Sequence, residues 1–163
     1  MSTIENSLAP LHVFNFDVDF YVDPLDSSES GGTDVAMCSG SFSECTGLEA
    51  TMEPKVIKEG GRNYGAAQRA GQVTFATVIL KRGMTSTGDL WNWFEMVSGG
   101  AYAHRLSAYI HMRDAAHRTV LTWKLINALP TKFKSADLNA KGTEIGVEEL
   151  HLVHEGITML YRG

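Results

Sequence analysis

The stretch from Val73 to Val97 constrains the fold most, because it joins an apolar strand pattern to the one convincing helix pattern of the chain. Residues 73–80 (VTFATVIL) are mostly β-branched and apolar on both faces. Such a run is typical of a strand that is covered on each side. Residues 81–83 (KRG) then predict the end of this strand, and a short loop leads into the helix.

The predicted helix spans about residues 86–98 and carries a start signal, a buried face and a stop signal. Ser86 and Thr87 offer a hydroxyl N-cap, and Asp89 places a carboxylate in the first turn, where the helix dipole favours an acid. The apolar side chains that follow at helical spacing are Leu90, Trp93, Phe94 and Val97. Two glycines at 99–100 mark the end. This single helix is expected to cover the open side of a β-structure.

Most of the remaining chain shows two-residue alternation, which predicts strands with one dry and one wet face. In residues 13–22, aromatic and branched side chains alternate with aspartates and an asparagine. Residues 37–45 and 48–57 are expected to form a strand pair with a turn near residues 46–47. Further strands are expected over residues 105–113, 119–128, 145–153 and 157–160. Leu129-Pro130 is expected to break its strand, because proline has no N–H to donate. The pattern favours a mainly β fold, an antiparallel sandwich or small barrel with one flanking helix.

The length of 163 residues suits one domain, which we place at residues 13–163 after a flexible N-terminal arm at residues 1–12. The net charge is -5, without a basic run, which argues against nucleic-acid binding. No apolar stretch approaches the roughly 20 residues that span a bilayer, and residues 1–12 lack a signal-peptide pattern. Cys38 and Cys45 would point to opposite faces of an extended segment, so we expect free thiols in a reducing cytoplasm.

No group of residues has the spacing of a catalytic or metal site. His151 and His154 lie three apart on a predicted strand and therefore face opposite sides, so they are expected to be ordinary strand histidines. Glu148 and Glu149 diverge in the same way, which favours solvated carboxylates over an acid/base pair. Residues 59–65 (EGGRNYG) lack the Gly-Lys-Ser/Thr of a phosphate-binding loop. We expect neither an enzyme nor a cofactor.

Two segments are candidates for contacts with other chains. Residues 58–72 form a long glycine-rich loop, which is either mobile or ordered against a neighbouring chain. Its interface candidates are the charged, amide and glycine residues Glu59, Gly60, Gly61, Arg62, Asn63 and Arg69. In the strand before it, Glu49, Thr51 and Glu53 share one polar face, which is either an ordinary solvent face or a surface with a specific role.

Five segments in consistent order between residues 13 and 160 carry short motifs of one known family. Residues 40–49 (GSFSECTGLE) resemble the turn GF-x-EVSGLE, with Cys45 in place of valine. Residues 58–63 (KEGGRN) resemble the loop EGG-x-N. The other segments, residues 78–93, 123–132 and 148–156, resemble ITLKRG…LW-x-W, W-x-L-x-NA-x-P-x-K and the closing strand. Together they resemble the tail tube proteins of contractile phage tails and phage-tail-like contractile injection systems.

The resemblance implies a sandwich subunit with one flanking helix, six copies of which form a ring-wide β-barrel around a lumen. Rings of this kind stack into a tube. A ring agrees with the predicted strands, which have one wet face, and with the need to pair their edge strands. A head-to-tail contact between subunits gives a ring when the rotation between them closes. Glu49, Thr51 and Glu53 are then candidates for the lumen lining, and the loop at residues 58–72 for the contact to a neighbouring subunit or ring.

The resemblance also implies a structural role in the inner tube, which conducts cargo or DNA when an outer sheath contracts. Expected partners are other copies of the chain, sheath protein, baseplate or spike proteins, and an effector or phage DNA in the lumen, without membrane insertion. The subunit would be made in the bacterial cytoplasm and end in an assembled particle. The alternative is a secreted ring-forming carrier or chaperone of effectors, whose discrete rings never stack. A small hydrolase or metal enzyme is a third hypothesis, without support from residue spacing.

Overall fold

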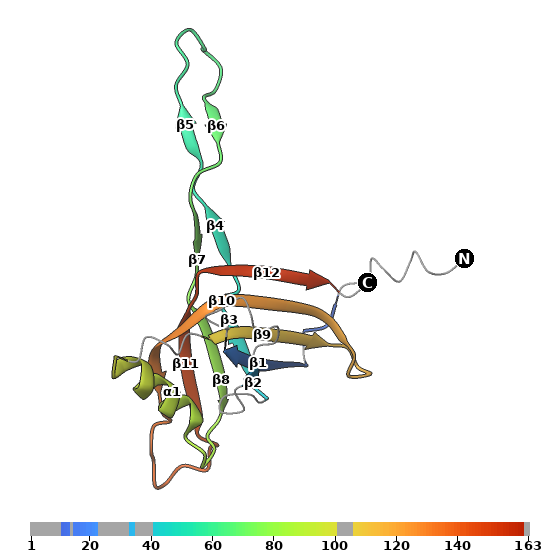
Figure 1. Cartoon of the computed structure of the whole chain (residues 1–163), viewed down its shortest axis with the longest axis vertical. Coiled ribbons are helices and arrows are strands. Elements are labelled where there is room, and N and C mark those ends of the chain that lie inside the picture. Colours follow the sequence, from blue (N-terminus) through green and yellow to red (C-terminus); the bar gives the residue numbers. More distant parts are fainter. Residues whose placement is uncertain (1–10, 14, 23–32, 35–40, 101–105, 162–163) are drawn as a thin grey trace, which may run out of the picture.

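The computed structural model describes residues 11–13, 15–22, 33–34, 41–100 and 106–161 (Figure 1). The flexible arm predicted at residues 1–12 falls, apart from Leu11 and His12, outside the described residues, as do Cys38 and the other residues before position 41 of the strand expected over residues 37–45. The elements are β1 Phe16–Val22, β2 Thr33–Asp34, β3 Glu44–Thr46, β4 Ala50–Met52, β5 Lys55–Ile57, β6 Ala67–Arg69, β7 Val73–Phe75, β8 Val78–Gly83, α1 Asp89–Ser98, β9 Leu106–Arg113, β10 Thr119–Lys134, β11 Val147–Val153 and β12 Gly156–Tyr161.

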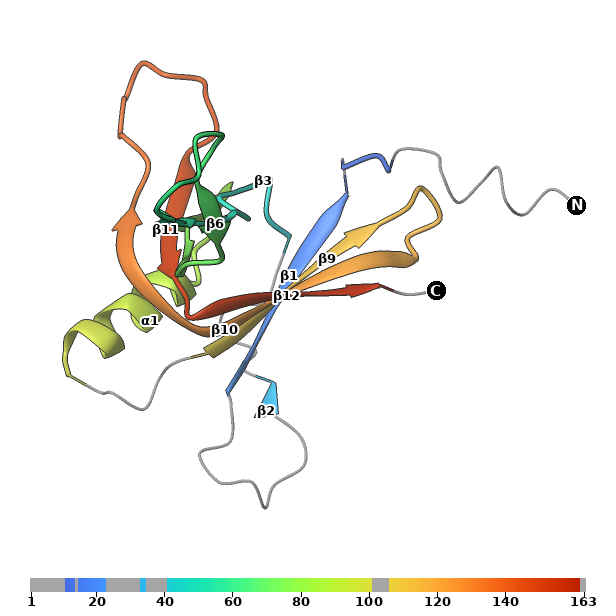
Figure 2. The same cartoon turned by 90° about the horizontal axis from the view of Figure 1, so that it is seen from above.

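Two antiparallel sheets share strand β10 and lie against each other (Figure 2). The strand order is β2-β1-β9-β10-β11-β8-β3, and β12 pairs with β10 as well. Fully buried side chains from both sheets, among them Phe20, Ile110, Leu80 and Leu152, form one core cluster. The predicted mainly β sandwich with a single helix is confirmed in the described residues.

The helix α1 covers one side of this core, as its sequence pattern predicts. Leu90 and Trp93 are buried, and the Trp93 ring meets Phe20 edge-on at 5.2 Å between ring centroids. The predicted hydroxyl N-cap is wrong: the cap residue is Gly88, in a left-handed conformation with φ 60°, and no side chain caps the helix. Instead Thr87 Oγ1 donates a hydrogen bond to Asp89 Oδ1, so the hydroxyl serves the first-turn carboxylate.

Strand β10 is longer than expected, because it passes through Pro130. The first part pairs with β9 and β12, and the part from Leu129 to Lys134 pairs with β11. The register shifts between Pro130 and Lys132, and such an irregularity accommodates a residue that has no N–H to donate. The predicted strand break at Leu129-Pro130 is therefore wrong. One continuous strand serves both sheets.

The strand predicted over residues 73–80 is divided into β7 and β8. Val78 and Leu80 of β8 are buried, whereas Val73 of β7 is 41% exposed. Between the two strands, the Thr77 carbonyl lies so close to Gly47 that a side chain at position 47 would collide with it. Gly47 also has φ +88°, a conformation that favours glycine. Here the chain leaves the sandwich. Even in β8 burial alternates, with Val78 and Leu80 buried and Ile79 and Lys81 only partly buried, so the expected cover on both faces is not complete.

The predicted pairing of residues 37–45 with residues 48–57 is also wrong. The part of the first segment that the structure describes, β3, pairs with β8, and Cys45 lies opposite Leu80. Residues of the second segment form β4 and β5, which pair with β7 and β6. Three residues of the predicted loop at 58–72 thus form a strand, β6. Among the described residues, no helix combines the length and apolar character needed to span a membrane.

Candidate functional site

The feature that departs most from a compact sandwich is a projecting hairpin, residues 49–76, which extends far beyond both sheets (Figure 1). Its stem is β4 paired with β7, and its outer part is β5 paired with β6. Both faces are open to solvent in the isolated chain: Met52 and Val56 are 51% and 56% exposed. The hairpin therefore has no buried apolar face of its own.

The tip of the projecting hairpin contains most of the predicted interface residues. Arg62 Nη1 lies 3.5 Å from Glu59 Oε2, and the Arg62 N–H donates to the Glu59 carbonyl at 3.3 Å. Gly61 has φ +84°, which permits this tight turn. The structure thus brings Glu59, Gly60, Gly61, Arg62 and Asn63 together in one turn. Arg69 lies apart from them on β6, opposite Lys55 of β5.

The three predicted lumen residues lie along the stem of the same hairpin. Glu49, Thr51 and Glu53 are all exposed. Thr51 Oγ1 lies 3.5 Å from Glu49 Oε1, and Thr74 Oγ1 donates to the Thr51 carbonyl at 3.4 Å. These contacts hold small polar groups in a row along the first strand of the hairpin. The row is short, because β4 has only three residues.

The base of the projecting hairpin is held by His154, which lies between β11 and β12. The His154 ring packs on Phe75 of β7, with 5.3 Å between ring centroids, and its Nδ1 is 3.1 Å from the Gly156 carbonyl oxygen. Burial lowers the pKa of His154 below its usual value. The neutral ring is therefore the form that this packing favours.

A second polar surface, not singled out in the sequence, lies on the outer face of β1, β9 and β10. Arg113 binds the Asp17 carboxylate through two nitrogens, at 2.6 and 2.7 Å. His111 lies 3.3 Å from Asp19 and 2.9 Å from the Thr122 hydroxyl. The hydrogen bond from Arg113 holds the pKa of Asp17 below its usual value. In the sequence, the signal for this surface is the alternation of aspartates in β1. Their partners Arg113 and His111 lie about 100 residues farther along the chain, so the sequence pattern does not identify them.

This second surface also contains aromatic rings. Tyr109 meets Tyr21 edge-on at 5.2 Å between ring centroids, and Lys124 Nζ lies 5.5 Å from the centre of the Tyr109 ring. Two acids, two bases and a histidine are therefore interleaved with tyrosines, and most of the charges have partners on the same face. Such a surface offers a weak net field and many hydrogen-bonding groups. We call it the polar sheet face.

A buried ion cluster ties α1 to the sheet behind it. Arg82 of β8 donates to Glu148 of β11 at 2.6 Å and is also bonded to Asp89 at the start of α1. The exposed fraction of the Arg82 side chain is 7%. Burial disfavours the charged guanidinium, but the hydrogen bonds to Asp89 and Glu148 outweigh burial, so the pKa of Arg82 is raised. These groups act in folding, because two carboxylates already occupy the arginine.

The histidines and the cysteine considered in the sequence have separate environments. His151 Nε2 lies 3.3 Å from Glu149 Oε2, whereas His154 packs on the hairpin base. Burial raises the pKa of the Cys45 thiol to about 12, which makes it a poor nucleophile at neutral pH. Within the described ranges, no three residues of the types His, Cys, Asp or Glu are grouped so that they could hold a metal ion.

The chain matches known proteins over nearly its whole length. The family model described as T4-like virus tail tube protein gp19 matches residues 12–158. A chain of the anti-feeding prophage (AFP) baseplate is 25% identical with a TM-score of 0.74, over 94% of this chain and 97% of that one. A chain of the sheath-tube complex of PVC, an extracellular contractile injection system, is 19% identical with a TM-score of 0.77, over 99% of both chains.

A third similar chain comes from the cap that terminates the AFP tube, with 18% identity, a TM-score of 0.74 and coverage of 99% and 100%. Among curated protein sequences, none matches significantly. The family model spans most of the chain, and the TM-scores show that the whole fold is shared rather than one motif. The chain belongs to the T4-like tail tube protein family.

Proposed function

We propose that this chain is the structural subunit of the inner tube of a contractile injection system or phage tail. The observation that carries the proposal is the projecting hairpin, a long extension with apolar and charged side chains exposed on a subunit of the tail tube family. Such an extension gains most of its contacts from another subunit. The shared fold with chains of the PVC sheath-tube complex and the AFP tube cap supports this role.

The subunits are proposed to close into six-membered rings, in which the sheets join into one barrel. β12 is an edge strand with Met159 and Leu160 exposed by 43% and 46%, and β2 and β3 end the shared strand order. Open edges with apolar side chains promote pairing with another chain. A head-to-tail contact between unlike edges generates a closed ring when the rotation between subunits permits it.

The tip of the projecting hairpin is the proposed contact to a neighbouring subunit or ring. Its members are the turn residues Glu59, Gly60, Gly61, Arg62 and Asn63, and Arg69 on the outer stem. Arg62 and Glu59 remain about half exposed although they form an ion pair. They are therefore available to charges on a second chain, and the glycines allow two backbones to approach closely.

Two surfaces are proposed to line the lumen. One is the row of Glu49, Thr51 and Glu53, and the other is the polar sheet face. Both present hydrogen-bonding groups without a large apolar patch, so cargo passes without adhering. Thr158 of β12 is exposed and lies opposite Lys124, on the same side as the polar sheet face. Coupling biotin to a cysteine at Thr51 or Thr158 tests the lumen assignment, because streptavidin is too large to enter a narrow tube. Binding of streptavidin to disassembled subunits but not to tubes is expected, and binding to intact tubes contradicts the assignment.

The mechanism in this proposal is mechanical rather than chemical. The tube is a rigid conduit that a contracting sheath drives through an envelope, and an effector or DNA moves through it. Sheath, baseplate and spike proteins are the proposed partners. The subunit is proposed to be made in the bacterial cytoplasm and to leave it only as part of the assembled particle.

Negative-stain electron microscopy of the purified protein, together with its mass in solution, tests the proposal. We expect six-subunit rings that stack into tubes with a central channel. Six-subunit rings that never stack, at any concentration, would favour the carrier of effectors instead. A protein that stays monomeric under all conditions contradicts both.

The variant Arg62→Glu separates assembly from folding. Because Arg62 lies at an exposed tip, its replacement is expected to change the free energy of unfolding by less than about 0.5 kcal/mol. Light scattering should show slower and weaker assembly. Arg118→Glu is the matched control, since Arg118 is also an exposed arginine with one acidic partner, but lies outside the projecting hairpin. Unchanged assembly of the Arg62 variant would remove the tip from the interface.

A further inference from the structure

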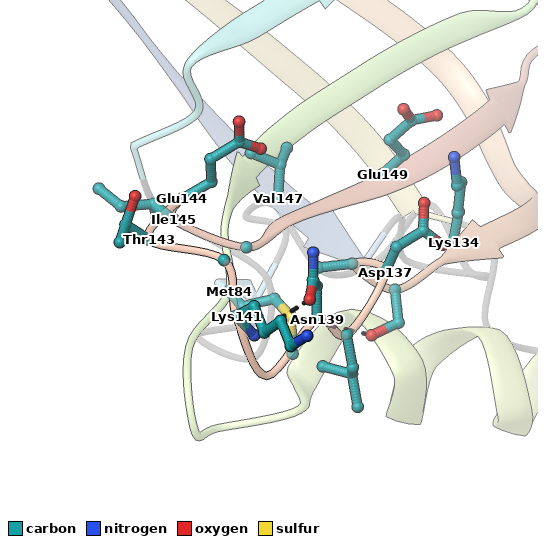
Figure 3. Close-up of a pocket in the computed structure, with 15 residues that line it drawn as sticks. Met84, Lys134, Asp137, Asn139, Lys141, Thr143, Glu144, Ile145, Val147 and Glu149 are labelled. Atoms are coloured by element: carbon teal, nitrogen blue, oxygen red, sulfur yellow. Dashed lines mark hydrogen bonds between the residues drawn. The ribbon is translucent and has the colours of Figure 1, made fainter.

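The loop that joins β10 to β11 lines an open pocket of about 750 Å³ (Figure 3). This volume lies in the range of about 300–1,000 Å³ that is typical of binding pockets. Met84 lies on one side, and the loop is braced from within by bonds from the Lys141 and Gly142 N–H groups to Asn139. The pocket is therefore formed by a structured loop. We call it the β10–β11 pocket.

The rim of the β10–β11 pocket carries apolar side chains that the subunit leaves in solvent. Leu138 and Ile145 are 91% and 85% exposed, and Met84 and Val147 are 45% and 41% exposed. Four such side chains around one polar depression form a surface that another molecule would cover. Exposed apolar side chains that gather in one place mark protein–protein interaction sites.

The loop between β10 and β11, which supplies most of the pocket lining, and the tip of the projecting hairpin lie at opposite ends of the subunit along its longest axis (Figure 1). Copies that stack in one direction along this axis bring the hairpin tip of one copy to the pocket end of the next. The occupant that this arrangement favours is thus a second copy of the chain. A partner of another kind would need no such relation between the two ends.

The charges of the two ends are complementary. Residues 55–69 contain the basic Lys55, Lys58, Arg62 and Arg69, with Glu59 as the one acid, in a chain whose net charge is -5. The side chains around the pocket include three acids, Asp137, Glu144 and Glu149, and two lysines, Lys134 and Lys141. Opposite net charges attract the two surfaces and fix their orientation.

The hairpin tip also supplies an anchor. Tyr64 is 93% exposed, next to Gly65 with φ +69°. A tyrosine brings an apolar ring and a hydroxyl, and tyrosines are enriched among the residues that dominate interface energies. An aromatic ring matches the exposed Met84 and Ile145, while the hydroxyl matches the polar lining of the pocket.

We propose that the β10–β11 pocket is the receptor for the hairpin tip of a second copy in the adjacent ring, with Tyr64 as the anchor. This inference rests on the proposed tube function and adds the receiving surface. Tyr64 contacts the apolar rim at Met84 and Ile145, and the basic side chains of the hairpin face the acids of the pocket.

Crosslinking between assembled copies tests the contact directly. The double variant Tyr64→Cys/Ile145→Cys is assembled, oxidised with copper phenanthroline and separated without reductant. A ladder of dimers and longer chains is expected, because each copy is linked to the next ring. Each single variant is a control for the native cysteines, and Tyr64→Cys/Thr158→Cys is a control for position. Tubes that form without a ladder would overturn the pocket assignment and leave the tube function intact.

A second measurement does not depend on a new disulfide. Tyr64→Ala is expected to raise the critical concentration for stacking at least about tenfold, the effect of losing one interface anchor. Tyr64→Phe retains the ring and should recover most of the stacking. Failure of the wild-type chain to form rings or tubes would refute the proposed function itself. Normal stacking by Tyr64→Ala would refute only the anchor.

Discussion

The sandwich and the projecting hairpin are both built from paired antiparallel strands, but only the sandwich has a core. Val18, Phe20 and Leu80 of the sandwich are completely buried. In the hairpin, Val56 is 56% exposed, and each strand is only three residues long. An isolated two-stranded hairpin is at best marginally stable in water.

The difference separates two tasks within one short chain. The sandwich contributes nearly all of the free energy of folding, because burial of apolar area is the dominant favourable contribution. The hairpin contributes little to this free energy and, in the proposed tube, would be covered by another subunit. Substitutions in the sandwich should therefore lower the stability of the subunit, whereas substitutions in the hairpin should weaken assembly.

The largest expected effect is in the core. Trp93→Ala removes a side chain that is 1% exposed and packs on Phe20, and should lower the free energy of unfolding by about 3–5 kcal/mol. Urea denaturation of the subunit measures it. Trp91→Ala, on the same helix but at a 46% exposed position, is the control and should cost less than half as much. Equal costs would show that α1 is not anchored by Trp93.

The second-largest effect on subunit stability is expected in the buried ion cluster beneath α1. Arg82→Met leaves the buried Glu148 carboxylate without its cation and should cost about 3 kcal/mol, although the side chain packs similarly. Arg118→Met removes the exposed pair with Asp114 and should cost less than about 1 kcal/mol. Thermal unfolding of both variants gives the comparison. If Arg82→Met left the stability of the subunit unchanged, the ion cluster would add no net stability over an apolar contact.

A smaller effect is expected at the junction between the two regions. The folded state lowers the pKa of His154. The contribution of the neutral His154 ring to the free energy of unfolding is therefore fully present above the unfolded pKa of about 6.5, and it is lost as the pH falls through the lowered pKa. The midpoint of thermal unfolding should therefore fall more from about pH 7.5 to 5.5 in the wild type than in His154→Asn. The asparagine keeps a donor for the Gly156 carbonyl but does not titrate. Parallel pH profiles would contradict this assignment.

The smallest effect on subunit stability, with a large effect on assembly, is expected in the hairpin. A side chain at Gly71 would overlap the Glu53 carbonyl oxygen, so Gly71→Ala should separate the strands of the hairpin. Gly60→Ala is the matched control for subunit stability, because open space surrounds that position in the isolated chain. We expect each to change the free energy of unfolding by less than about 1 kcal/mol. Gly71→Ala should prevent stacking, whereas Gly60→Ala, which adds one methyl group at the tip itself, should only weaken it. Electron microscopy of both proteins decides between these outcomes.

The sandwich could be predicted largely from the sequence, because its signals are local. The alternation in β1 and the helical spacing of Leu90 and Trp93 depend on which face is buried, and burial is what periodicity reports. The strand through Pro130 could not be predicted in this way. Its continuation depends on β11, which pairs from about 20 residues away and accommodates the proline at an irregularity in the register.

Most strands of the projecting hairpin are predicted by the sequence, but their pairing is not. β4, β5 and β7 lie within the strands expected over residues 48–57 and 73–80, whereas β6 lies in the expected loop. Ala50 pairs with Phe75 across that loop, and the strands have no buried face that would indicate a partner. The glycines and charges of its tip were visible in the sequence, and those around Glu59 and Arg62 do lie together. The ion pairs Arg82–Glu148 and Arg113–Asp17 join residues 66 and 96 positions apart, so single-sequence patterns carry no signal for them.

Because β10 continues from one sheet into the other, the two halves of the sandwich share a covalent backbone at their seam. Sliding one sheet along the other requires the hydrogen bonds of β10 to break on both sides. Under an axial load, each subunit should deform as a single stiff body, and the compliance of a stack of such bodies should be concentrated in the joints between them. Bending stiffness would then be set by the joint rather than by the core.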